Sequence, residues 1–358
     1  MVRLYVTKGI FFVLCIFLPF SFSFIGCLGN KISSDTTNIK KSYPPITIHV
    51  FNRKGYGYPF VGIHLKGFSS RANKFGEAVI KNPGPGRYCV RISSRDYIDT
   101  FKSIDIEDGK RYYSITVKLL KAKKIRITGL DEDKNIRRND ISFSIQANTL
   151  VDKKGKPVKS ATIIYRTIRF NRDGLDAMPG EFSGVQNSRT TPIESLGAFS
   201  FKATSKNKEL KIKKGSKIVV TIPLQNAKNE KKVPLWRFDQ NTGMWIKVDQ
   251  GTVSRNGRSK VIKVEIKKMT WWNIDKPLKD TTSIWVQSFR NKRGRTVDVT
   301  ELLGKGIDYN GITHGNSVKS KVKKGKCIDV KLGSHVMLLT KVKGRKGYFF
   351  YPNAIKTK

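Results

Sequence analysis

The chain has 358 residues, 38% of them hydrophobic, and its 70 lysines and arginines against 27 acidic residues give a formal charge of +43. This apolar content is enough for packed cores and argues against wholesale disorder, and the length suggests two or three domains. Four cysteines and four histidines are too few for a disulfide-rich mini-protein or a zinc-array protein, and the composition also argues against a multi-span membrane protein.

The amino terminus has the parts of a secretory signal over residues 1–26: a basic start, an apolar run at 9–20 and a short stretch before a cysteine. The sequence FIGC follows at 24–27. It resembles the lipobox of bacterial lipoproteins, in which the cysteine is lipidated and the chain is cut before it, although phenylalanine stands where leucine is usual. The resemblance implies a lipid on Cys27. Leu28 in the next position implies an outer-membrane location if the cell has that membrane.

Two alternatives remain for this segment, a plain signal peptide cut nearby and an uncleaved anchor helix. The apolar run is short for a membrane span, which needs about 20 residues. A lipoprotein signal is therefore favoured over plain secretion, and both over a permanent helix. Residues 27–45 are mostly polar and end in two prolines, which is typical of a flexible tether.

Short alternating runs separated by glycine, asparagine, aspartate and proline make up the rest of the chain. This pattern predicts an all-β protein built of tandem β-sandwich modules of transthyretin or immunoglobulin-like type. A first module is expected at residues 46–120. Its strands are predicted at 46–50, 61–65, 77–80, 86–92 and 112–119.

Three motifs follow one another in that first module. They are P-x-x-G-I-x-L at 59–65, N-K-x-G-E-A at 73–78 and G-x-Y-x-V-x-I at 86–92. Their order resembles the carboxypeptidase regulatory-like (transthyretin-like) module, which implies a β-sandwich. Residues 281–358 are interpreted as a second, diverged copy, because GKCIDV at 325–330 corresponds to GRYCVR at 86–91 with a one-residue shift. A final hairpin is expected there, with strands at 336–342 and 348–351.

The middle module, residues 121–280, has the most distinctive motifs, MPGEF at 178–182, PLWRFDQNTGMW at 234–245 and WWNIDKP at 271–277. Their succession resembles a β-sandwich region of bacterial surface proteins that also occurs in the cartilage intermediate layer proteins of animals, beside regulatory-like modules.

The tryptophans of the middle module carry a physical prediction. Trp236 and Phe238 alternate on one strand and Trp245 begins the return strand, so this hairpin is expected in a core. Trp271 and Trp272 should point to opposite faces of a strand. One of them is then expected in the core, with the other exposed or at a domain junction.

Motifs of catalysis are mostly missing. None of the four histidines is followed three residues later by glutamate, so a zinc carboxypeptidase is not indicated, and neither metal nor cofactor is expected. GEFSG at 180–184 has the wrong spacing for a nucleophile elbow. Thr270 stands where some sandwiches of the ZU5 type cut themselves, but no neighbouring histidine activates it. A disulfide between Cys89 and Cys327 is possible in an exported protein; two buried free thiols are favoured.

Basic charge is densest in residues 281–358. Solvated strand faces explain part of it, since outward lysines discourage edge pairing, and a generally basic proteome would give such charge with no partner. The near absence of balancing acid nevertheless predicts attraction to a polyanion: anionic lipid, lipopolysaccharide, acidic glycan or extracellular DNA. The candidate contacts are Arg290, Lys292, Arg293, Arg295, Lys321, Lys323, Lys324, Lys343, Arg345 and Lys346.

Three functional hypotheses remain. The first is a non-enzymatic, lipid-anchored cell-envelope protein, structural or adhesive, that holds an anionic surface or polymer through these basic clusters. The second is an accessory subunit that binds a protein or glycan through a sandwich face, which an exposed Trp271 or Trp272 would favour. The third is an enzyme, either a self-cleaving module or an unrecognised hydrolase, which an aspartate, a histidine and a hydroxyl clustered in one cleft would revive.

Overall fold

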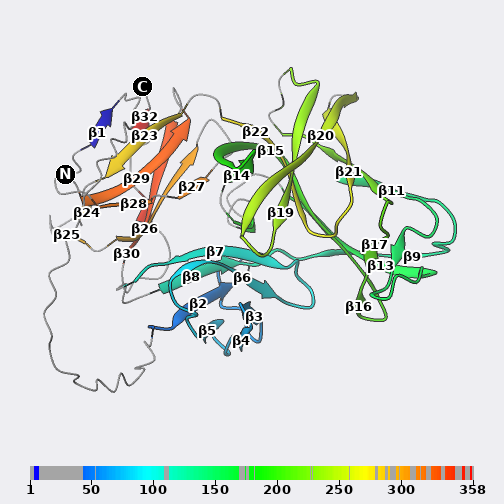
Figure 1. Cartoon of the computed structure of the whole chain (residues 1–358), viewed down its shortest axis with the longest axis horizontal. Helices are drawn as coiled ribbons and strands as arrows, with labels where there is room; N and C mark the ends of the chain where they lie inside the picture. Colours follow the sequence, from blue (N-terminus) through cyan, green and yellow to red (C-terminus); the bar gives the residue numbers. More distant parts are fainter. Residues whose placement is uncertain are drawn as a thin grey trace, which may run out of the picture.

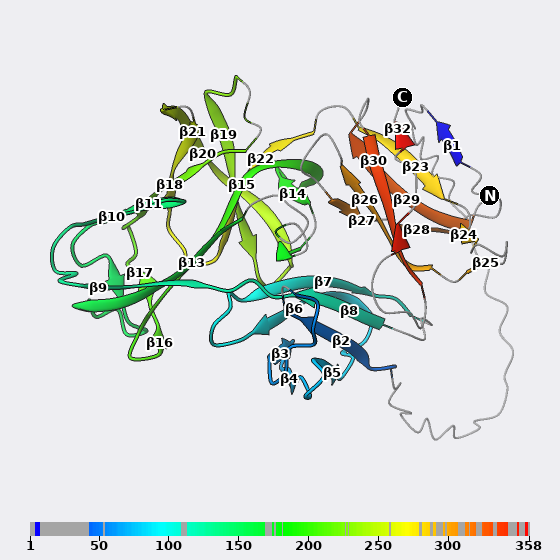
Figure 2. The same cartoon turned by 180° about the vertical axis from the view of Figure 1, so that it is seen from behind.

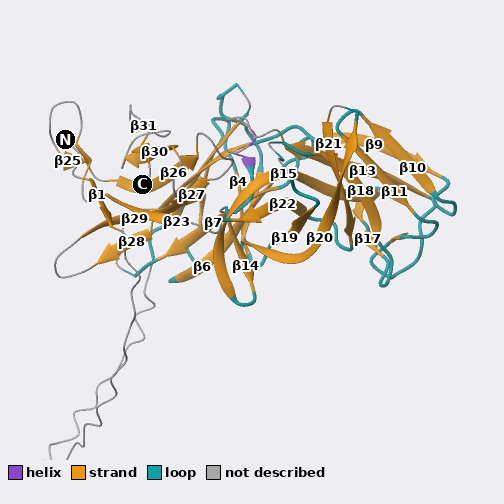
Figure 3. Ribbon diagram, turned by 90° about the horizontal axis from the view of Figure 1, so that it is seen from above, coloured by secondary structure: helices purple, strands orange, loops and turns teal. Residues whose placement is uncertain are grey.

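The computed structural model describes residues 43–278, apart from 53, 109–112, 169–173, 175–176, 181, 226, 228 and 258. Outside that range it describes strands β1 and β23–β32, mostly as backbone alone. The described elements are nearly all strands, as Figure 3 shows. The predicted all-β class is therefore confirmed. No helix among the described residues is long and apolar enough to span a membrane.

The first sandwich consists of two sheets. The three-stranded sheet has the order β5 (Glu77–Ile80), β2 (Ile46–Phe51), β8 (Tyr113–Lys118), with β2 and β8 parallel. The four-stranded sheet has the order β4 (Phe68–Arg71), β3 (Gly62–Leu65), β6 (Gly86–Ser93), β7 (Thr100–Ile106). Alternate residues of β2 are buried, so one face of each sheet closes a common apolar core.

Five strands of this sandwich lie where the alternation predicts them, within a residue or two at their ends. The prediction missed β4 and β7. β4 has the sequence FSSR, which carries no alternating apolar signal. In β7 the first two residues, Thr100 and Phe101, are both buried, because one face of the strand packs on the first sandwich and the other on the middle one. The strand therefore lacks a clear alternation.

The middle sandwich is one continuous sheet that folds over on itself. Its path is β10-β11-β18-β21-β20-β19-β22-β15-β13-β9, with β14 and β16 attached beside β15, and β12 and β17 form a separate pair. The bounds are Lys123–Thr128 (β9), Lys134–Arg138 (β10), Ile141–Ile145 (β11), Leu150–Val151 (β12), Ser160–Ile168 (β13), Ser183–Gln186 (β14), Arg189–Ser205 (β15), Lys208–Glu209 (β16), Lys211–Ile212 (β17), Ile218–Pro223 (β18), Lys232–Asp239 (β19), Met244–Asn256 (β20), Ser259–Ile266 (β21) and Trp271–Pro277 (β22).

Both faces of this sheet are buried where β22 runs between β15 and β19. Trp272 points inward to the core that the folded sheet encloses, which also contains Phe143 and Phe201. Trp271 points outward into a second core with Phe238 and Trp245. The two tryptophans therefore do lie on opposite faces, and the predicted core hairpin of β19 and β20 is confirmed. Neither tryptophan is exposed: Trp272 lies in the enclosed core, and Trp271 is covered by the first sandwich.

The carboxyl-terminal strands, together with β1 from the amino terminus, form three further sheets. Their orders are β1-β23-β29-β28, β24-β25 and β27-β26-β30-β31, with β32 beside β30. The bounds are Leu4–Thr7 (β1), Thr281–Val286 (β23), Phe289–Arg290 (β24), Thr296–Val297 (β25), Val299–Gly306 (β26), Ile312–His314 (β27), Asn316–Lys319 (β28), Lys324–Lys331 (β29), His335–Val342 (β30), Phe349–Phe350 (β31) and Ile355–Lys356 (β32).

The predicted final hairpin is present as the pairing of β30 with β31. The strand order of this part differs from that of the first sandwich. β29 pairs with β23, the first strand after the middle sandwich, whereas β6, its proposed counterpart, lies in the sheet that lacks β2. Strand order thus gives no support to a diverged copy. That kinship and the domain boundaries stay predictions.

The first sandwich lies against the middle one (Figures 1 and 2), and an apolar seam of side chains joins the two. On the first sandwich it consists of Ile98, Phe101 and Leu120, all at most 6% exposed. The side chains from the middle sandwich are Ile168, Ala177, Met178, Phe182, Ile193, Ala198, Trp236, Phe238, Trp245 and Trp271. The ring centroids of Phe101 and Phe238 are 5.4 Å apart. The two sandwiches therefore share a core of the kind found inside a single domain.

Hydrogen bonds run along the same seam. The Trp271 indole donates to the Asp99 carbonyl at 2.7 Å, and the Ser103 hydroxyl donates to the Gly243 carbonyl at 2.8 Å. Lys102 Nζ donates to the Met178 carbonyl at 3.0 Å. A Cβ on Gly243 would collide with the Ser103 hydroxyl, and its φ of +69° favours glycine in any case. The backbone of the turn between β19 and β20 therefore packs directly against β7.

Replacing Phe101 by alanine tests the seam. Because the ring is 2% exposed and leaves a cavity between the sandwiches, Phe101→Ala should lower the free energy of unfolding by about 3–5 kcal/mol. Phe75→Ala is the matched control, since that ring is 63% exposed, and should cost at most about 0.5 kcal/mol. Urea unfolding followed by tryptophan fluorescence measures both. Equal unfolding midpoints for the two variants would contradict a shared core.

Candidate ligand-binding cleft

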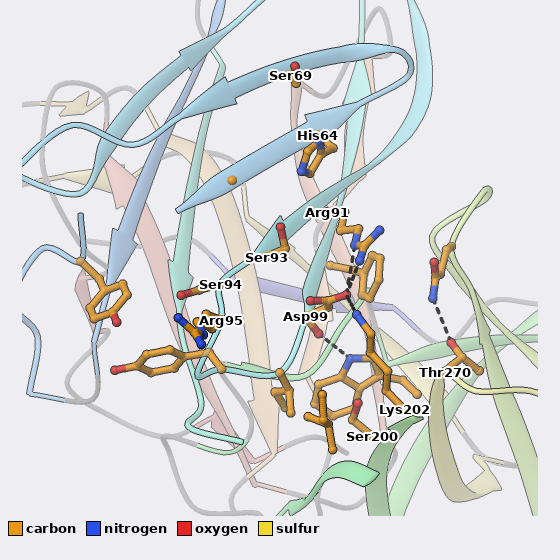
Figure 4. A pocket seen from close by; sticks show the side chains of 18 of the residues that line it. His64, Ser69, Arg91, Ser93, Ser94, Arg95, Asp99, Ser200, Lys202 and Thr270 are labelled. Atoms are coloured by element: carbon orange, nitrogen blue, oxygen red, sulfur yellow. Dashed lines mark hydrogen bonds and ion pairs between the residues drawn. The ribbon is translucent and has the colours of Figure 1, made fainter. Parts of the chain in front are cut away.

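A cleft of about 1150 Å³ opens beside the seam, between the two sandwiches. Figure 4 shows it from close by. One wall comes from β3, β4 and β6 and from the loop at residues 94–99. The other comes from β15 and the segment leading into β22. Phe101 and Trp271 line both the seam and the cleft, so the packing of the seam fixes how the two walls face one another.

A network of four charges crosses the cleft. The Asp99 carboxylate forms an ion pair with Arg91 at 2.6 Å and lies 3.5 Å from Lys202 Nζ. Lys202 and Arg91 also reach Glu209 at 2.5 and 3.5 Å. The hydrogen bond from Lys202, followed by the charges of Lys202 and Arg91, lowers the pKa of Glu209 despite its partial burial. These two acids and two bases therefore compensate one another.

Two further cations of the cleft belong to no ion pair among the described residues. Arg71, at the end of β4, and Arg95, in the loop after β6, are both exposed and line the cavity. Neither side chain makes an ion pair or hydrogen bond with another described residue, although the charge of Arg95 acts on the neighbouring carboxylate of Asp96, which is paired with Lys124. Among the lining residues Asp99 is the one carboxylate against four arginines and lysines. The cleft thus has a surplus of positive charge from two guanidinium groups that are free to bind.

Hydroxyl groups fill the space between these cations. The hydroxyl-bearing residues Ser69, Ser70, Ser93, Ser94, Ser200 and Thr270 line the cavity. The position of Gly62, between β3 and β6, is crowded, because a Cβ there would stand 3.1 Å from Ser93 Oγ and 3.2 Å from His64 Nε2. The cleft therefore offers many small hydrogen-bonding groups, and at Gly62 its wall has no side chain.

The cleft does contain an aspartate, a histidine and hydroxyls, the combination that would revive the enzyme hypothesis. Nucleophilic catalysis needs the base within hydrogen-bond reach of the nucleophile and an orienting group on the base. Asp99 instead binds Arg91 and Lys202. Among the described residues His64 makes no hydrogen bond to a hydroxyl or a carboxylate. Asp99, His64 and the hydroxyls of the described lining are therefore not arranged as a nucleophile, base and orienting group.

A separate polar cluster is buried in the middle sandwich, on the outer face of β15 and β22. The Ser195 hydroxyl donates to Asp275 at 2.6 Å, and the Asn273 amide donates to Ser195 at 2.9 Å and also to Asp275. Burial raises the pKa of Asp275 well above its ordinary value. A bulge between Ser195 and Gly197 turns Ser195 to this face. The cluster has no opening to the cleft and serves the fold.

The residues predicted as sites fall mostly outside the described part of the chain. Cys27 does, and so do eight of the ten basic residues of the carboxyl-terminal clusters. Arg290 lies on β24 and Lys324 on β29, strands described by their backbone alone. Their predicted roles stay predictions. Arg71, Arg91, Arg95 and Lys202 of the cleft were not singled out from the sequence, because they come from three separate segments, β4, β6 with the loop after it, and β15, which share no motif.

Cys89 is a free thiol that is partly buried beside the seam, as favoured from the sequence. Burial, then the charge of Asp239, raises its pKa to about 12. The side chain of Cys327 is not described. The exposed tryptophan that would have favoured binding through a sandwich face is not found, since Trp271 and Trp272 are 1% and 2% exposed.

Comparison with known proteins gives one family match. The model of the amino-terminal region of FAM171A1/A2/B matches residues 173–277, less than a third of the chain. That segment covers β14–β22 and contains both the core hairpin and the paired tryptophans. It lies within the stretch whose motifs resemble the cartilage intermediate layer proteins. No curated protein matches the chain.

Two solved structures of a Bacillus cereus protein align with most of this chain, but at very low sequence identity and structural similarity. The crystal structure of BcpA, the major pilin subunit, is 8% identical, covers 87% of this chain and 94% of its own, and has a TM-score of 0.20. A single-substitution variant of the same pilin subunit is 12% identical, covers 88% and 95%, and has a TM-score of 0.19. At these TM-scores the likeness supports no statement about this chain.

The buried Asp275 predicts a pH dependence of stability. Its folded pKa lies above the unfolded value of about 3.9, so the stability that the neutral carboxyl provides is full below that pH and is lost as pH rises toward the folded pKa. Asp275→Asn does not titrate. Between pH 4 and pH 8 the variant should therefore gain stability relative to the wild type, by urea unfolding. The exposed Asp249→Asn is the control, and a pH-independent difference for Asp275→Asn would contradict burial of the carboxyl.

Proposed function

We propose that this chain is a non-enzymatic binding protein of the cell envelope, structural or adhesive in role, that takes an anionic ligand in the cleft between its first and middle sandwiches. The observation that carries the proposal is the pair Arg71 and Arg95, exposed in the cleft with no ion-pair partner among the described residues. Their neighbours Arg91 and Lys202 are already neutralised by acids. A ligand with negative charge supplies what this site lacks.

The chemistry of the two arginines supports this proposal. A guanidinium group is planar, is always charged near neutral pH and binds a carboxylate, sulfate or phosphate through two parallel hydrogen bonds. Walls of low dielectric focus the field of such charges into a cleft. The compensated network around Asp99 contributes differently, because it holds the two walls in place while Arg71 and Arg95 stay outside the ion pairs of the cleft.

The wider charge distribution points the same way. Several acidic side chains of the described part are already used in ion pairs, such as Asp140 with Lys123 at 2.7 Å and Glu265 with Lys217 at 2.6 Å. With 70 basic residues against 27 acidic ones, most cations have no such partner. We propose that this surplus, including the basic clusters within residues 290–346, attracts the molecule to anionic lipid, lipopolysaccharide, acidic glycan or DNA, and that the cleft provides the specific contact.

Lipidation of Cys27 is the remaining part of the proposal, and it would fix the molecule to the membrane through the tether at residues 27–45. Protein purified from its native membrane should have a chain that begins at Cys27 and a lipid-sized increase in intact mass. Cys27→Ser should abolish both the mass increase and the membrane partitioning. An unmodified wild-type chain would overturn the anchor and leave a secreted binder of polyanions.

Binding of fluorescein-labelled polyglutamate tests the anionic cleft. The affinity should fall as salt is raised from about 50 to 300 mM, because exposed charges are screened beyond roughly 10 Å at 0.1 M. At the lower salt, Arg71→Gln with Arg95→Gln should weaken binding at least about tenfold, because the variant removes two charged contacts and tenfold corresponds to only about 1.4 kcal/mol. Arg126→Gln with Arg137→Gln removes two exposed charges elsewhere and is the matched control. Equal affinities of the two double variants would contradict the cleft as the site.

A further inference from the structure

The lining of the cleft indicates a more specific ligand than an anion. We infer that the cleft binds an acidic saccharide, with aromatic rings against its sugar faces, serine hydroxyls on its ring hydroxyls, and Arg71 and Arg95 on its carboxylate or sulfate groups. This inference rests on the proposed function, because it names the ligand class of the same site. Its evidence is a second set of lining residues, the aromatic group Tyr58, Phe60 and Tyr97.

Phe60 is held in a conformation that costs free energy. Its φ is +56°, in the left-handed region that glycine and asparagine adopt readily and bulky residues rarely do. The backbone is fixed there by a hydrogen bond from the Phe60 N–H to the Ala72 carbonyl at 3.0 Å. The ring is 67% exposed, so packing does not repay the strain. Strain of this kind gathers at functional sites, and here it presents an aromatic face at the cleft.

Tyr58 and Tyr97 extend this aromatic surface into the cleft. Their rings meet edge to face with centroids 4.7 Å apart. Tyr97 is held by its N–H bond to the Ser94 carbonyl, at 3.3 Å. Both rings are partly exposed. Pyranose rings have one face of C–H groups that packs on aromatic rings, and a rim of hydroxyls that needs many donors and acceptors. Aromatic residues beside a row of serines match both requirements.

Other anions fit this lining less well. The cleft holds about 1150 Å³, which exceeds the volume needed for a single phosphate or carboxylate and fits a short oligomer. Serines and arginines lie among apolar lining residues such as Ile98, Ile164 and Met269, so the lining is mixed rather than a continuous apolar slot for an acyl chain. A nucleic acid carries a phosphate at every residue and gains from a longer basic track, whereas this cleft has two free guanidinium groups among hydroxyls. An oligosaccharide with acidic groups matches that ratio.

Calorimetric titration of the full chain with four probes tests the inference. The probes are hexagalacturonate, a heparin-derived hexasaccharide, neutral maltohexaose and the oligonucleotide dT8. The decisive variant is Phe60→Gly, because glycine adopts the positive φ without strain, so the fold is kept while the ring is lost. Phe75→Ala is the control, since it removes an exposed ring outside the cleft. Arg71→Gln with Arg95→Gln removes the charge alone.

The inference predicts that at least one acidic hexasaccharide binds more tightly than dT8 and maltohexaose. Phe60→Gly should weaken that binding at least fivefold, and the arginine double variant at least tenfold, while Phe75→Ala leaves it unchanged. If the arginine variant weakens all anions alike and Phe60→Gly has no effect, the saccharide is wrong and the anionic cleft stands. Tighter binding of dT8 would also overturn the saccharide. If the arginine variant changes nothing, the inference and the proposed anionic cleft both fail.

Discussion

The burial of Trp271 between the two sandwiches is the contact on which the rest of the structure depends. Its ring lies in the outer core of the middle sandwich against the first sandwich, and its indole donates to the Asp99 carbonyl at 2.7 Å. A buried indole N–H left without an acceptor would cost free energy, so this bond fixes how Asp99 approaches as well as satisfying the donor. The first and middle sandwiches are therefore packed as one body, with Phe101 and Phe238 extending the same contact.

The cleft follows from this packing. Once the Asp99 backbone is held by Trp271, its carboxylate meets Arg91 from the first sandwich and Lys202 from the middle one. The outer face of β15 changes along its length accordingly. It is apolar at Ala198, inside the seam, and polar at Ser200 and Lys202, where the sandwiches diverge and the cleft begins. One stretch of β15 thus packs in the seam, and the next stretch lines the cleft.

Much of the fold was predictable from local pattern. Alternation located the core strands of the first sandwich, and the spacing of Trp236, Phe238 and Trp245 predicted a buried hairpin. The paired tryptophans correctly implied two faces, and the burial of both showed that the second face is a junction. Short strands without apolar alternation, such as β4, were missed, since their place depends on partners distant in sequence. The bulge that turns Ser195 outward leaves no mark in the residue pattern.

The cleft was not predictable for the same reason. Arg71, Arg95 and Lys202 are ordinary exposed cations in a chain that has 70 of them, and only the docking of two sandwiches distinguishes them. Phe60 lies inside the motif at 59–65, just before the strand predicted at 61–65, and the residue pattern does not indicate its positive φ. The basic clusters near the carboxyl terminus, which the sequence does single out, lie mostly outside the described residues. Charge density in the sequence indicates the carboxyl-terminal clusters, whereas the cleft cations are recognised only from the folded structure.

The most direct test of the account is whether the first and middle sandwiches tumble together. Nitrogen-15 relaxation of the full chain gives a rotational correlation time for the amides of β2 in the first sandwich and of β18 in the middle one. A shared core predicts the same correlation time for both sets, because they belong to one rigid body. A clearly shorter time for β2 would show that the first sandwich reorients by itself, and would contradict both the seam and the cleft that it forms.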